Sequence, residues 1–152
     1  MENEHKHRVA AWWSSGQTAL AKSDSARTPS TLPCRGQFGG LEGRWTPEDL
    51  FVGAVASCYT TRFHVIADSS KSDYHDLEVG AERTATKTGS GYSFSEIVLR
   101  PSLTIPSEDG RERAVTRLQK ARELCLLSRA LATAQSFETK ISISQQTSVC
   151  AR

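Results

Sequence analysis

A helix start followed by a long apolar run constrains this chain more than any other feature. Thr46 stands at an N-cap position, Pro47 at the first helical position, and two carboxylates follow at the positive end of the helix dipole. Asp49 comes three residues after Thr46, as the acid of a capping box does. The segment from Leu50 to Ala67 then predicts one helix, whose first turns have almost no polar face. A helix that is apolar all round is a buried helix, so this one is predicted to be the core of the fold.

Strand patterns flank this helix on both sides. Val9, Ala11 and Trp13 alternate with more polar residues, and residues 14–33 predict further strands with irregular connections before a glycine-rich loop at 36–40. Beyond the helix, Leu77 to Ala85 and Tyr92 to Ile105 predict two strands. The turn sequence 88–91 joins them as a hairpin. Pro101 indicates an edge position or a bulge in the second strand.

The last third of the sequence predicts two helices and a strand. Ser107 is the predicted cap of a helix from Glu108 to Glu123, and a short helix is expected from about Cys125 to Ala134. Phe137 to Ser144 alternates as a final strand. The order of these elements predicts a single α+β domain over residues 1–152, with loosely ordered tails at 1–7 and 147–152.

Composition limits the classes of function. The 152 residues carry a net charge of +2 with both signs interspersed, which argues against nucleic-acid binding. Residues 1–7 are polar with no apolar segment of a signal peptide behind them, and the apolar stretch 50–59 is too short to span a bilayer. We therefore expect a soluble, cytoplasmic protein without membrane association. Four cysteines are too few for a disulfide scaffold, which leaves catalysis, metal binding or no role.

The cysteines differ in their surroundings. Cys58 lies inside the predicted core helix, where a free cysteine most often acts as a small apolar residue. Cys125 lies at or just before a helix start, where free N–H groups favour a thiolate. Cys34 in a loop and Cys150 near the C-terminus are more typical of incidental residues. Neither Cys58 nor Cys125, taken by itself, is marked as catalytic by its surroundings.

The histidines do not predict a metal site. They are His5, His7, His64 and His75, and neither a CxxC nor an HExxH spacing occurs. Zinc sites are usually marked by such local pairs. His5 and His7 are better explained by a disordered tail than by a metal. We expect no bound metal.

Two segments together resemble one protein family. Residues 46–59, TPEDLFVGAVASCY, resemble the central helix of the OsmC/Ohr family of osmotically induced and organic hydroperoxide resistance proteins. That family has a pattern of Asn or Thr, Pro, Glu, any residue and Leu, then small residues before A-x-C-(F/Y). Residues 120–131, KARELCLLSRAL, resemble its second cysteine segment, and the 67-position gap between the cysteines also suits the family. The resemblance extends over roughly residues 8 to 146 and favours the osmotically induced branch.

The resemblance implies a fold and an activity. The fold would be antiparallel sheets around a long buried central helix that carries the first cysteine, in an intertwined homodimer. The activity would be a cysteine-based peroxidase for organic hydroperoxides in oxidative stress defence. Cys58 would be the peroxidatic residue and Cys125 the resolving residue, and the two would form an intramolecular disulfide. A dithiol such as dihydrolipoamide would reduce that disulfide, and no metal or organic cofactor would be required.

The resemblance also implies an activating cation. An ordinary thiol is only partly ionised at pH 7, and burial makes ionisation harder. In the family an arginine contacts the peroxidatic sulfur and a glutamate holds that arginine. Glu48 matches the glutamate, although an acid in the first helical turn is also explained by the helix dipole. The sequence departs from the hydroperoxide-resistance branch, because residues 12–17, WWSSGQ, contain no arginine. Arg35 is the candidate by placement in the osmotically induced branch, and Arg44 is the second.

Helix geometry places this site between two chains. Glu48 and Cys58 are ten residues apart on one helix, which separates them by about 15 Å along its axis. Glu48 therefore cannot reach the Cys58 of its own chain. A symmetric dimer with antiparallel central helices would bring Glu48 of one chain towards Cys58 of the other.

Two other functions fit the same sequence. A non-catalytic member could bind a small apolar ligand at the dimer interface, lined by the aromatic residues Trp12, Trp13, Trp45, Phe51 and Tyr59, although aromatic residues are more often plain core. Alternatively, the cysteines could sense oxidants and signal to a partner. Peroxide-dependent loss of thiols distinguishes the peroxidase from the binding protein.

Overall fold

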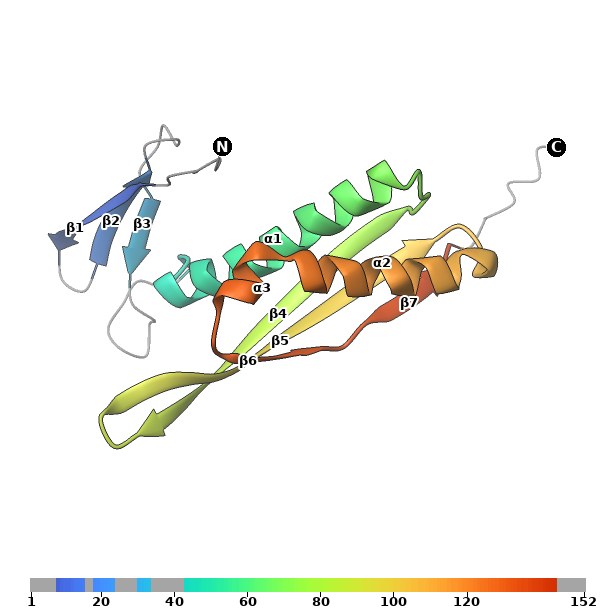
Figure 1. The fold of residues 1–152 in the computed structure, drawn as a ribbon. Coiled ribbons are helices and arrows are strands. Elements are labelled where there is room, and N and C mark those ends of the chain that lie inside the picture. Colours follow the sequence, from blue (N-terminus) through green and yellow to red (C-terminus); the bar gives the residue numbers. More distant parts are fainter. Residues whose placement is uncertain (1–7, 16–17, 24–29, 34–42, 145–152) are drawn as a thin grey trace, which may run out of the picture. The chain divides into compact units, whose positions relative to one another are not determined.

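The computed structural model describes residues 8–15, 18–23, 30–33 and 43–144. The chain divides into two compact units, Met1–Phe51 and Val52–Arg152. In the first unit, β1 (Val9–Ser15), β2 (Thr18–Ser23) and β3 (Ser30–Pro33) form an antiparallel sheet in that order (Figure 1). The strand predicted from the alternation after Val9 is therefore confirmed. The loop expected at 36–40 and both predicted tails lie outside the described residues.

The start of α1 (Pro47–Ser69) is the capping box that the sequence predicts. The Asp49 amide donates to Thr46 Oγ1 at 3.1 Å, and the Thr46 amide donates back to Asp49 Oδ2 at 2.9 Å. These two bonds satisfy backbone N–H groups that a helix start otherwise leaves free. Thr46 is buried, so the cap is sheltered from water. The cap fixes where this helix of 23 residues begins.

One stripe of α1 is buried, at the spacing of a helical face. The buried residues are Val52, Val55, Tyr59, Phe63, Ile66 and Ala67. The opposite side contains Ala54 and Val65, which are exposed, Val65 by 55%. The prediction that this helix is buried all round is therefore wrong for a single chain, because the described residues pack against one face of it and leave the other exposed. By length and composition α1 could span a membrane, but its buried stripe packs in the protein core.

The second unit contains a four-stranded sheet. The long strands β4 (Asp76–Thr88) and β5 (Gly91–Ile105) form an antiparallel hairpin, and Thr88 pairs with Gly91 across the two-residue turn. This confirms the predicted strands and their turn. Two short strands, β6 (Ala134–Phe137) and β7 (Lys140–Ile143), pair in parallel with β5. The single final strand predicted at 137–144 is thus two strands with a break between them.

Pro101 lies in the central strand of this sheet, which corrects the prediction of an edge strand or bulge. It pairs with Val79 of β4 on one side of β5. On the other side, β6 pairs with Glu96 to Leu99 and β7 with Ser102 to Ile105, so Pro101 falls in the gap between them. Proline has no N–H to donate, and this gap requires none. The bulge in the hairpin lies elsewhere, between Thr84 and Ala85.

The helices after β5 begin and end differently from the prediction. A 3₁₀ turn, η2 (Glu108–Gly110), precedes α2 (Arg111–Leu124). Ser107 is extended and its side chain makes no capping hydrogen bond, so the predicted cap role is wrong. The third helix, α3 (Leu126–Ala130), has only five residues and not the ten expected. The chain leaves the helical conformation at Leu131, which is extended, and β6 begins at Ala134.

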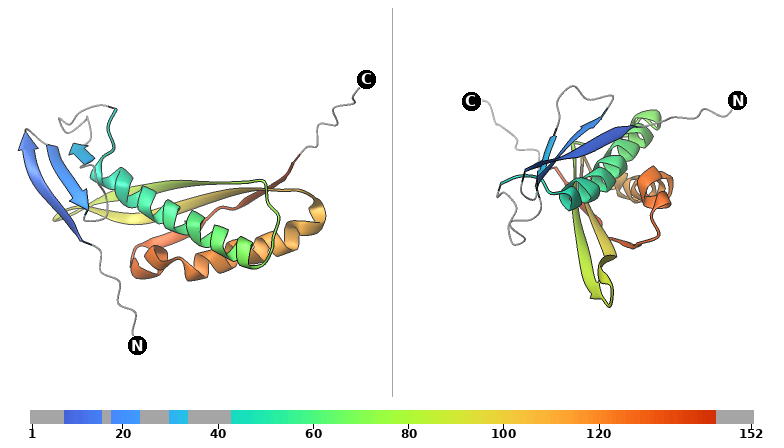
Figure 2. Two further views of the ribbon diagram at one scale, coloured as in Figure 1. Left: turned by 90° about the horizontal axis from the view of Figure 1, so that it is seen from above. Right: turned by 90° about the vertical axis from the view of Figure 1, so that its left-hand side faces the viewer.

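The core of the second unit lies between the two long helices and the sheet. α1 and α2 lie beside each other and cover β5, while the tip of the β4–β5 hairpin extends beyond them (Figures 1 and 2). The core cluster joins residues from α1, β5 and α2 to Cys125: Val55, Tyr59, Phe63, Ile66, Ala67, Leu99, Leu103, Ile105, Ala114, Leu118, Ala121 and Cys125. A cysteine is therefore a member of the main hydrophobic core.

The end of α1 offers a stability prediction. Ser72 N donates to Ala67 O at 2.9 Å and Lys71 N to Asp68 O at 3.0 Å, the two bonds of a Schellman motif. Lys71 has φ of 47°, a left-handed conformation that favours glycine. We expect Lys71→Gly to raise the free energy of unfolding by about 0.5–1 kcal/mol. Urea denaturation with an unchanged m-value measures this gain, and Lys71→Ala, which keeps the strain, should show none. An equal gain in both variants would contradict the strain argument.

Candidate functional site

Cys58 lies at the border between the buried and the open face of α1. Its neighbours Val55 and Tyr59 are buried, whereas Ser57 is exposed. The Cys58 side chain is half-buried and packs against the core cluster, and its thiol is free. The hydroxyl of Thr61 donates to the Cys58 carbonyl oxygen at 3.1 Å, within the helix. Cys58 is thus anchored in a rigid element while part of its side chain remains open to a reactant.

Cys125 lies between α2 and α3 and is completely buried. Its backbone is extended, with φ of −66° and ψ of 113°, so it separates the two helices. The Arg129 amide donates to the Cys125 carbonyl oxygen at 3.1 Å as α3 begins. Its thiol is free and makes no capping hydrogen bond. Cys58 and Cys125 therefore share one packed core, one at its edge and the other inside it.

Tyr59 connects the two cysteine segments. It follows Cys58 in the chain, and its hydroxyl donates to the Leu118 carbonyl oxygen of α2 at 3.0 Å. Burial raises the pKa of Tyr59 well above its usual value, the nearby thiol of Cys125 raises it further, and the Arg122 guanidinium acts in the opposite direction. The phenol thus stays protonated and remains a hydrogen-bond donor. This bond connects α1 to the middle of α2.

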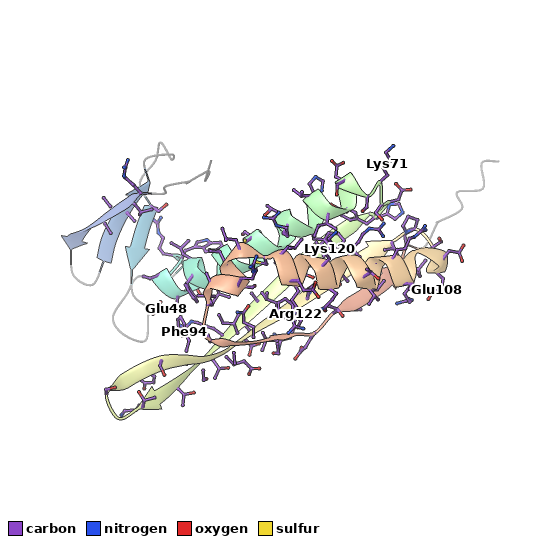
Figure 3. The ribbon with its side chains drawn as sticks, in the orientation of Figure 1. Glu48, Lys71, Phe94, Glu108, Lys120 and Arg122 are labelled. Carbon is purple, nitrogen blue, oxygen red and sulfur yellow. The ribbon has the colours of Figure 1, made fainter. Side chains whose placement is uncertain are left out.

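The guanidinium of Arg122 is a cation close to Tyr59. It lies on the last turn of α2 (Figure 3), and its guanidinium carbon is 4.4 Å from the centre of the Phe137 ring. The Phe137 ring is in turn 5.7 Å from that of Tyr59. Neither Arg122 nor Phe137 was predicted as a site residue. The available signal was the position of Arg122, three residues before Cys125, but nothing in the sequence indicated that Phe137 would hold its side chain.

Glu48 has a buried oxygen without a partner. It lies in the first turn of α1 (Figure 3), and among the described residues nothing hydrogen-bonds to its Oε2 atom, although that atom is buried. A buried carboxylate oxygen without a donor is energetically unfavourable. Arg44 is exposed, while Arg35 and Cys34 lie outside the described residues, as does Cys150.

The aromatic residues proposed as pocket lining have different environments. Tyr59 is completely buried in the core, whereas Trp45 is 62% exposed. Phe51 is half-buried. The side chains of Trp12 and Trp13 lie outside the described residues. Tyr59 is therefore a packing and hydrogen-bonding residue and does not line an open pocket.

The fold and the site together define a class. The chain is an α+β protein whose long core helix presents one half-buried thiol, with a second thiol in the core behind it. Residues 39–140 match the family described as OsmC-like protein, a segment that contains both cysteines and more than half of the chain. The chain belongs to the OsmC-like family, and its mixed fold of a sheet and a long helix is that of the OsmC and Ohr proteins.

Relatives with this fold come from several bacteria. The uncharacterized protein YmaD of Bacillus subtilis (strain 168) is 22% identical over 131 residues, which cover 84% of this chain and 87% of YmaD. An OsmC-like protein of unknown function from Vibrio cholerae has a TM-score of 0.79 at 18% identity, covering 90% of this chain and 99% of that one. An organic hydroperoxide resistance protein from Elizabethkingia anophelis has a TM-score of 0.74 at 19% identity, covering 95% and 100%.

Proposed function

We propose that the protein is a thiol-dependent peroxidase that reduces organic hydroperoxides, with Cys58 as the peroxidatic and Cys125 as the resolving cysteine. The observation that carries the proposal is the placement of the two thiols, one half-buried and one fully buried, around a single core. Membership of the OsmC-like family, which includes organic hydroperoxide resistance proteins, supports a peroxide-related role in stress defence.

The first step consumes the peroxide. The Cys58 thiolate attacks the terminal oxygen of ROOH, an S–O bond forms and the O–O bond breaks, and the alkoxide leaves as ROH after taking a proton. Cys58 is oxidised to a sulfenic acid while the peroxide is reduced to an alcohol. The half-buried position of Cys58 favours this role, because the attacking sulfur must meet a reactant from outside.

The second step forms the disulfide. The Cys125 sulfur attacks the sulfenic sulfur of Cys58, an S–S bond forms, and hydroxide leaves as water with the thiol proton. An external dithiol, of the lipoyl type by analogy with the family, then reduces the disulfide and is itself oxidised. Burial of Cys125 suits this role, since its partner is an internal sulfur and not a solute.

Activation of Cys58 is assigned to a cation held by Glu48. Arg35 remains our proposal for that cation, with Arg44 as the second candidate. The orphaned Oε2 atom of Glu48 supports a guanidinium partner for this carboxylate. A homodimer follows from the same reasoning, because ten residues of helix separate Glu48 from its own Cys58. The exposed apolar residues of α1, such as Val65, favour burial by a second chain.

A stoichiometric oxidation tests the proposal. A Cys34→Ser/Cys150→Ser variant keeps only the two proposed redox thiols. After full reduction, one equivalent of cumene hydroperoxide should remove two thiols per chain and yield one intramolecular disulfide, detected by mass spectrometry without reduction. Restored thiols after dihydrolipoamide treatment complete the cycle. Thiols that do not respond to the peroxide would contradict the proposal and favour a non-catalytic ligand-binding member.

A further inference from the structure

A hollow of about 360 Å³ lies at the far end of α1, within the second unit. α1 ends at Ser69, and residues 70–74 form one wall of the hollow, while the end of β5 and the first turns of α2 form the others. The apolar part of its floor that a ligand can reach is formed by Tyr74 and Pro106, whereas Phe63, Leu103 and Ile105 are almost completely buried. This volume is within the range of small-molecule sites. Ser70 is twelve residues beyond Cys58, about 18 Å along the helix, so the hollow is separate from the proposed redox site.

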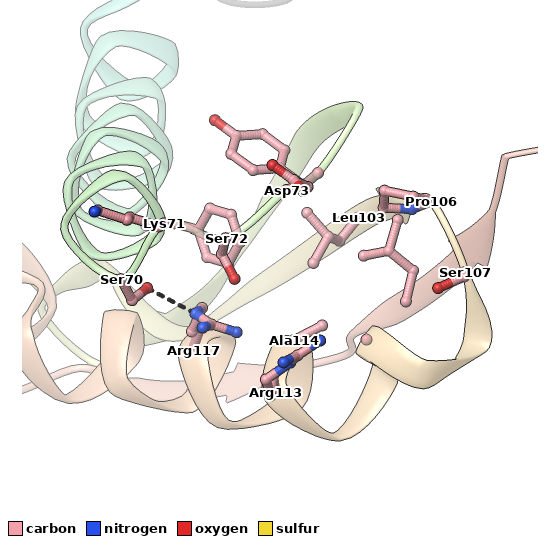
Figure 4. A pocket seen from close by; sticks show the side chains of 14 residues that line it. Ser70, Lys71, Ser72, Asp73, Leu103, Pro106, Ser107, Arg113, Ala114 and Arg117 are labelled. Atoms are coloured by element: carbon pink, nitrogen blue, oxygen red, sulfur yellow. Dashed lines mark hydrogen bonds between the residues drawn. The ribbon is translucent and has the colours of Figure 1, made fainter.

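Two arginines from successive turns of α2 face this hollow. Arg113 and Arg117 lie on the same side of α2 (Figure 4), and the Arg117 Nε atom donates to Ser70 Oγ at 2.8 Å across the opening between the helices. A second hollow of about 330 Å³ shares both arginines and Ser70, and it is also lined by Lys120. The cations thus stand between two open spaces, where a ligand can reach them from either side.

The positive charge of the side chains that line the two hollows is not neutralised by other residues that the structure describes. α2 contains five cations and two carboxylates, a net charge of +3. Its Arg111 is paired with Glu108, but neither Arg113 nor Arg117 forms an ion pair among the described residues. Asp73 lines the first hollow and Glu112 the second, one carboxylate against three cations in each. Like charges four residues apart destabilise a helix, so this arrangement has a cost.

We propose that this hollow is a binding site for a small organic anion. Its carboxylate or phosphate group would lie against Arg113 and Arg117, and its apolar part against Tyr74 and Pro106. The free N–H groups of Arg117, beyond the one bonded to Ser70, would donate to the anion oxygens. Two guanidiniums over an apolar floor select a ligand with an anionic end and an apolar body. The anion would also remove the repulsion between the arginines.

Isothermal titration of the reduced full-length protein tests this site. The probes are inorganic phosphate, phenyl phosphate and benzoate, at constant ionic strength set with NaCl. We expect saturable binding of phenyl phosphate or benzoate, tighter than that of inorganic phosphate because the apolar floor is used. Arg113→Gln and Arg117→Gln should each weaken binding by about tenfold or more, the scale of one charged hydrogen bond. The benzoate and phenyl phosphate arms distinguish a carboxylate from a phosphate ligand.

A control variant with the same change in net charge distinguishes a specific anion site from general electrostatic attraction. Lys87→Gln, on the exposed end of β4, removes one positive charge far along the sheet and should leave the affinity unchanged. Equal weakening in all three variants, or no saturable binding of any probe, would overturn the proposal. The Arg113 side chain makes no hydrogen bond to another described residue, so Arg113→Gln is the deciding variant if loss of the Arg117–Ser70 bond unfolds the protein.

Discussion

Cys58→Ser is expected to abolish hydroperoxide reduction, lowering the second-order rate of peroxide consumption by about three orders of magnitude or more. A serine hydroxyl is almost the same size as the thiol, so the packing of α1 against the core is kept. It is, however, a far weaker nucleophile at neutral pH, because it remains protonated. The loss should therefore fall on the chemical step and not on stability.

The measurement is the rate of cumene hydroperoxide consumption with excess dihydrolipoamide, in the background that lacks Cys34 and Cys150. Ser57→Ala is the matched control, since Ser57 is the exposed neighbour of Cys58 and its hydroxyl donates to the Gly53 carbonyl oxygen of its own helix at 2.7 Å. The control should keep wild-type activity. Turnover that survives in Cys58→Ser would remove Cys58 from the mechanism.

The start of α1 could be predicted from sequence because its determinants are local. A cap residue and an acid three positions later can bond to each other without any distant partner, and Thr46 and Asp49 form those bonds as expected. The strands of the long hairpin were predictable for the same reason, since alternation and the turn at 88–91 are both local signals. In each case the sequence that determines the structure lies inside the element.

The errors have a common physical cause, which is that the deciding partner is distant in sequence. Pro101 is accommodated in a central strand because β6 and β7 leave a gap opposite it, thirty or more residues later in the chain. The open face of α1 depends on which elements pack on it, and a pattern of apolar residues cannot distinguish burial by the same chain from burial by another. Ser107 is the exception, because the 3₁₀ turn that separates it from α2 is formed by the residues that follow it directly.

The residues of the candidate site also differ in whether local sequence or distant partners determine them. Cys58 and Cys125 were found through motifs at a characteristic separation, and the structure adds that they share a core. Tyr59 was named only as an aromatic residue, yet its hydroxyl reaches the Leu118 carbonyl oxygen of another helix. Arg122 was missed because its relation to Tyr59 passes through Phe137, which lies on a strand. Such relations arise only when three elements pack together.

Cys125→Ala is expected to separate the two steps of the cycle. The first oxidation of Cys58 should proceed at the wild-type rate, because the peroxide reacts before the second sulfur is needed. The intramolecular disulfide should then be absent, and Cys58 should accumulate as a sulfenic acid that a dimedone probe traps. Excess peroxide should oxidise it further to the sulfinic acid, which thiols do not reduce.

Alanine is the informative substitution because Cys125 is completely buried among apolar residues. A serine there would add a hydroxyl in the core and could destabilise the protein for that reason alone. Alanine removes only the sulfur, at a cost of about 1 kcal/mol, comparable with the loss of one methyl-sized group. A thermal melt therefore verifies that the variant is folded before oxidation is measured.

The difference in burial gives this experiment an independent check. In the reduced native protein without Cys34 and Cys150, iodoacetamide should alkylate the half-buried Cys58 much faster than the fully buried Cys125. In Cys125→Ala the alkylation rate of Cys58 should be unchanged, because its exposure is set by α1 and not by the missing sulfur. If Cys125→Ala instead slows both alkylation and the first oxidation, Cys125 acts on the reactivity of Cys58 directly. The resolving role would then be wrong, because a resolving thiol enters only after the sulfenic acid has formed.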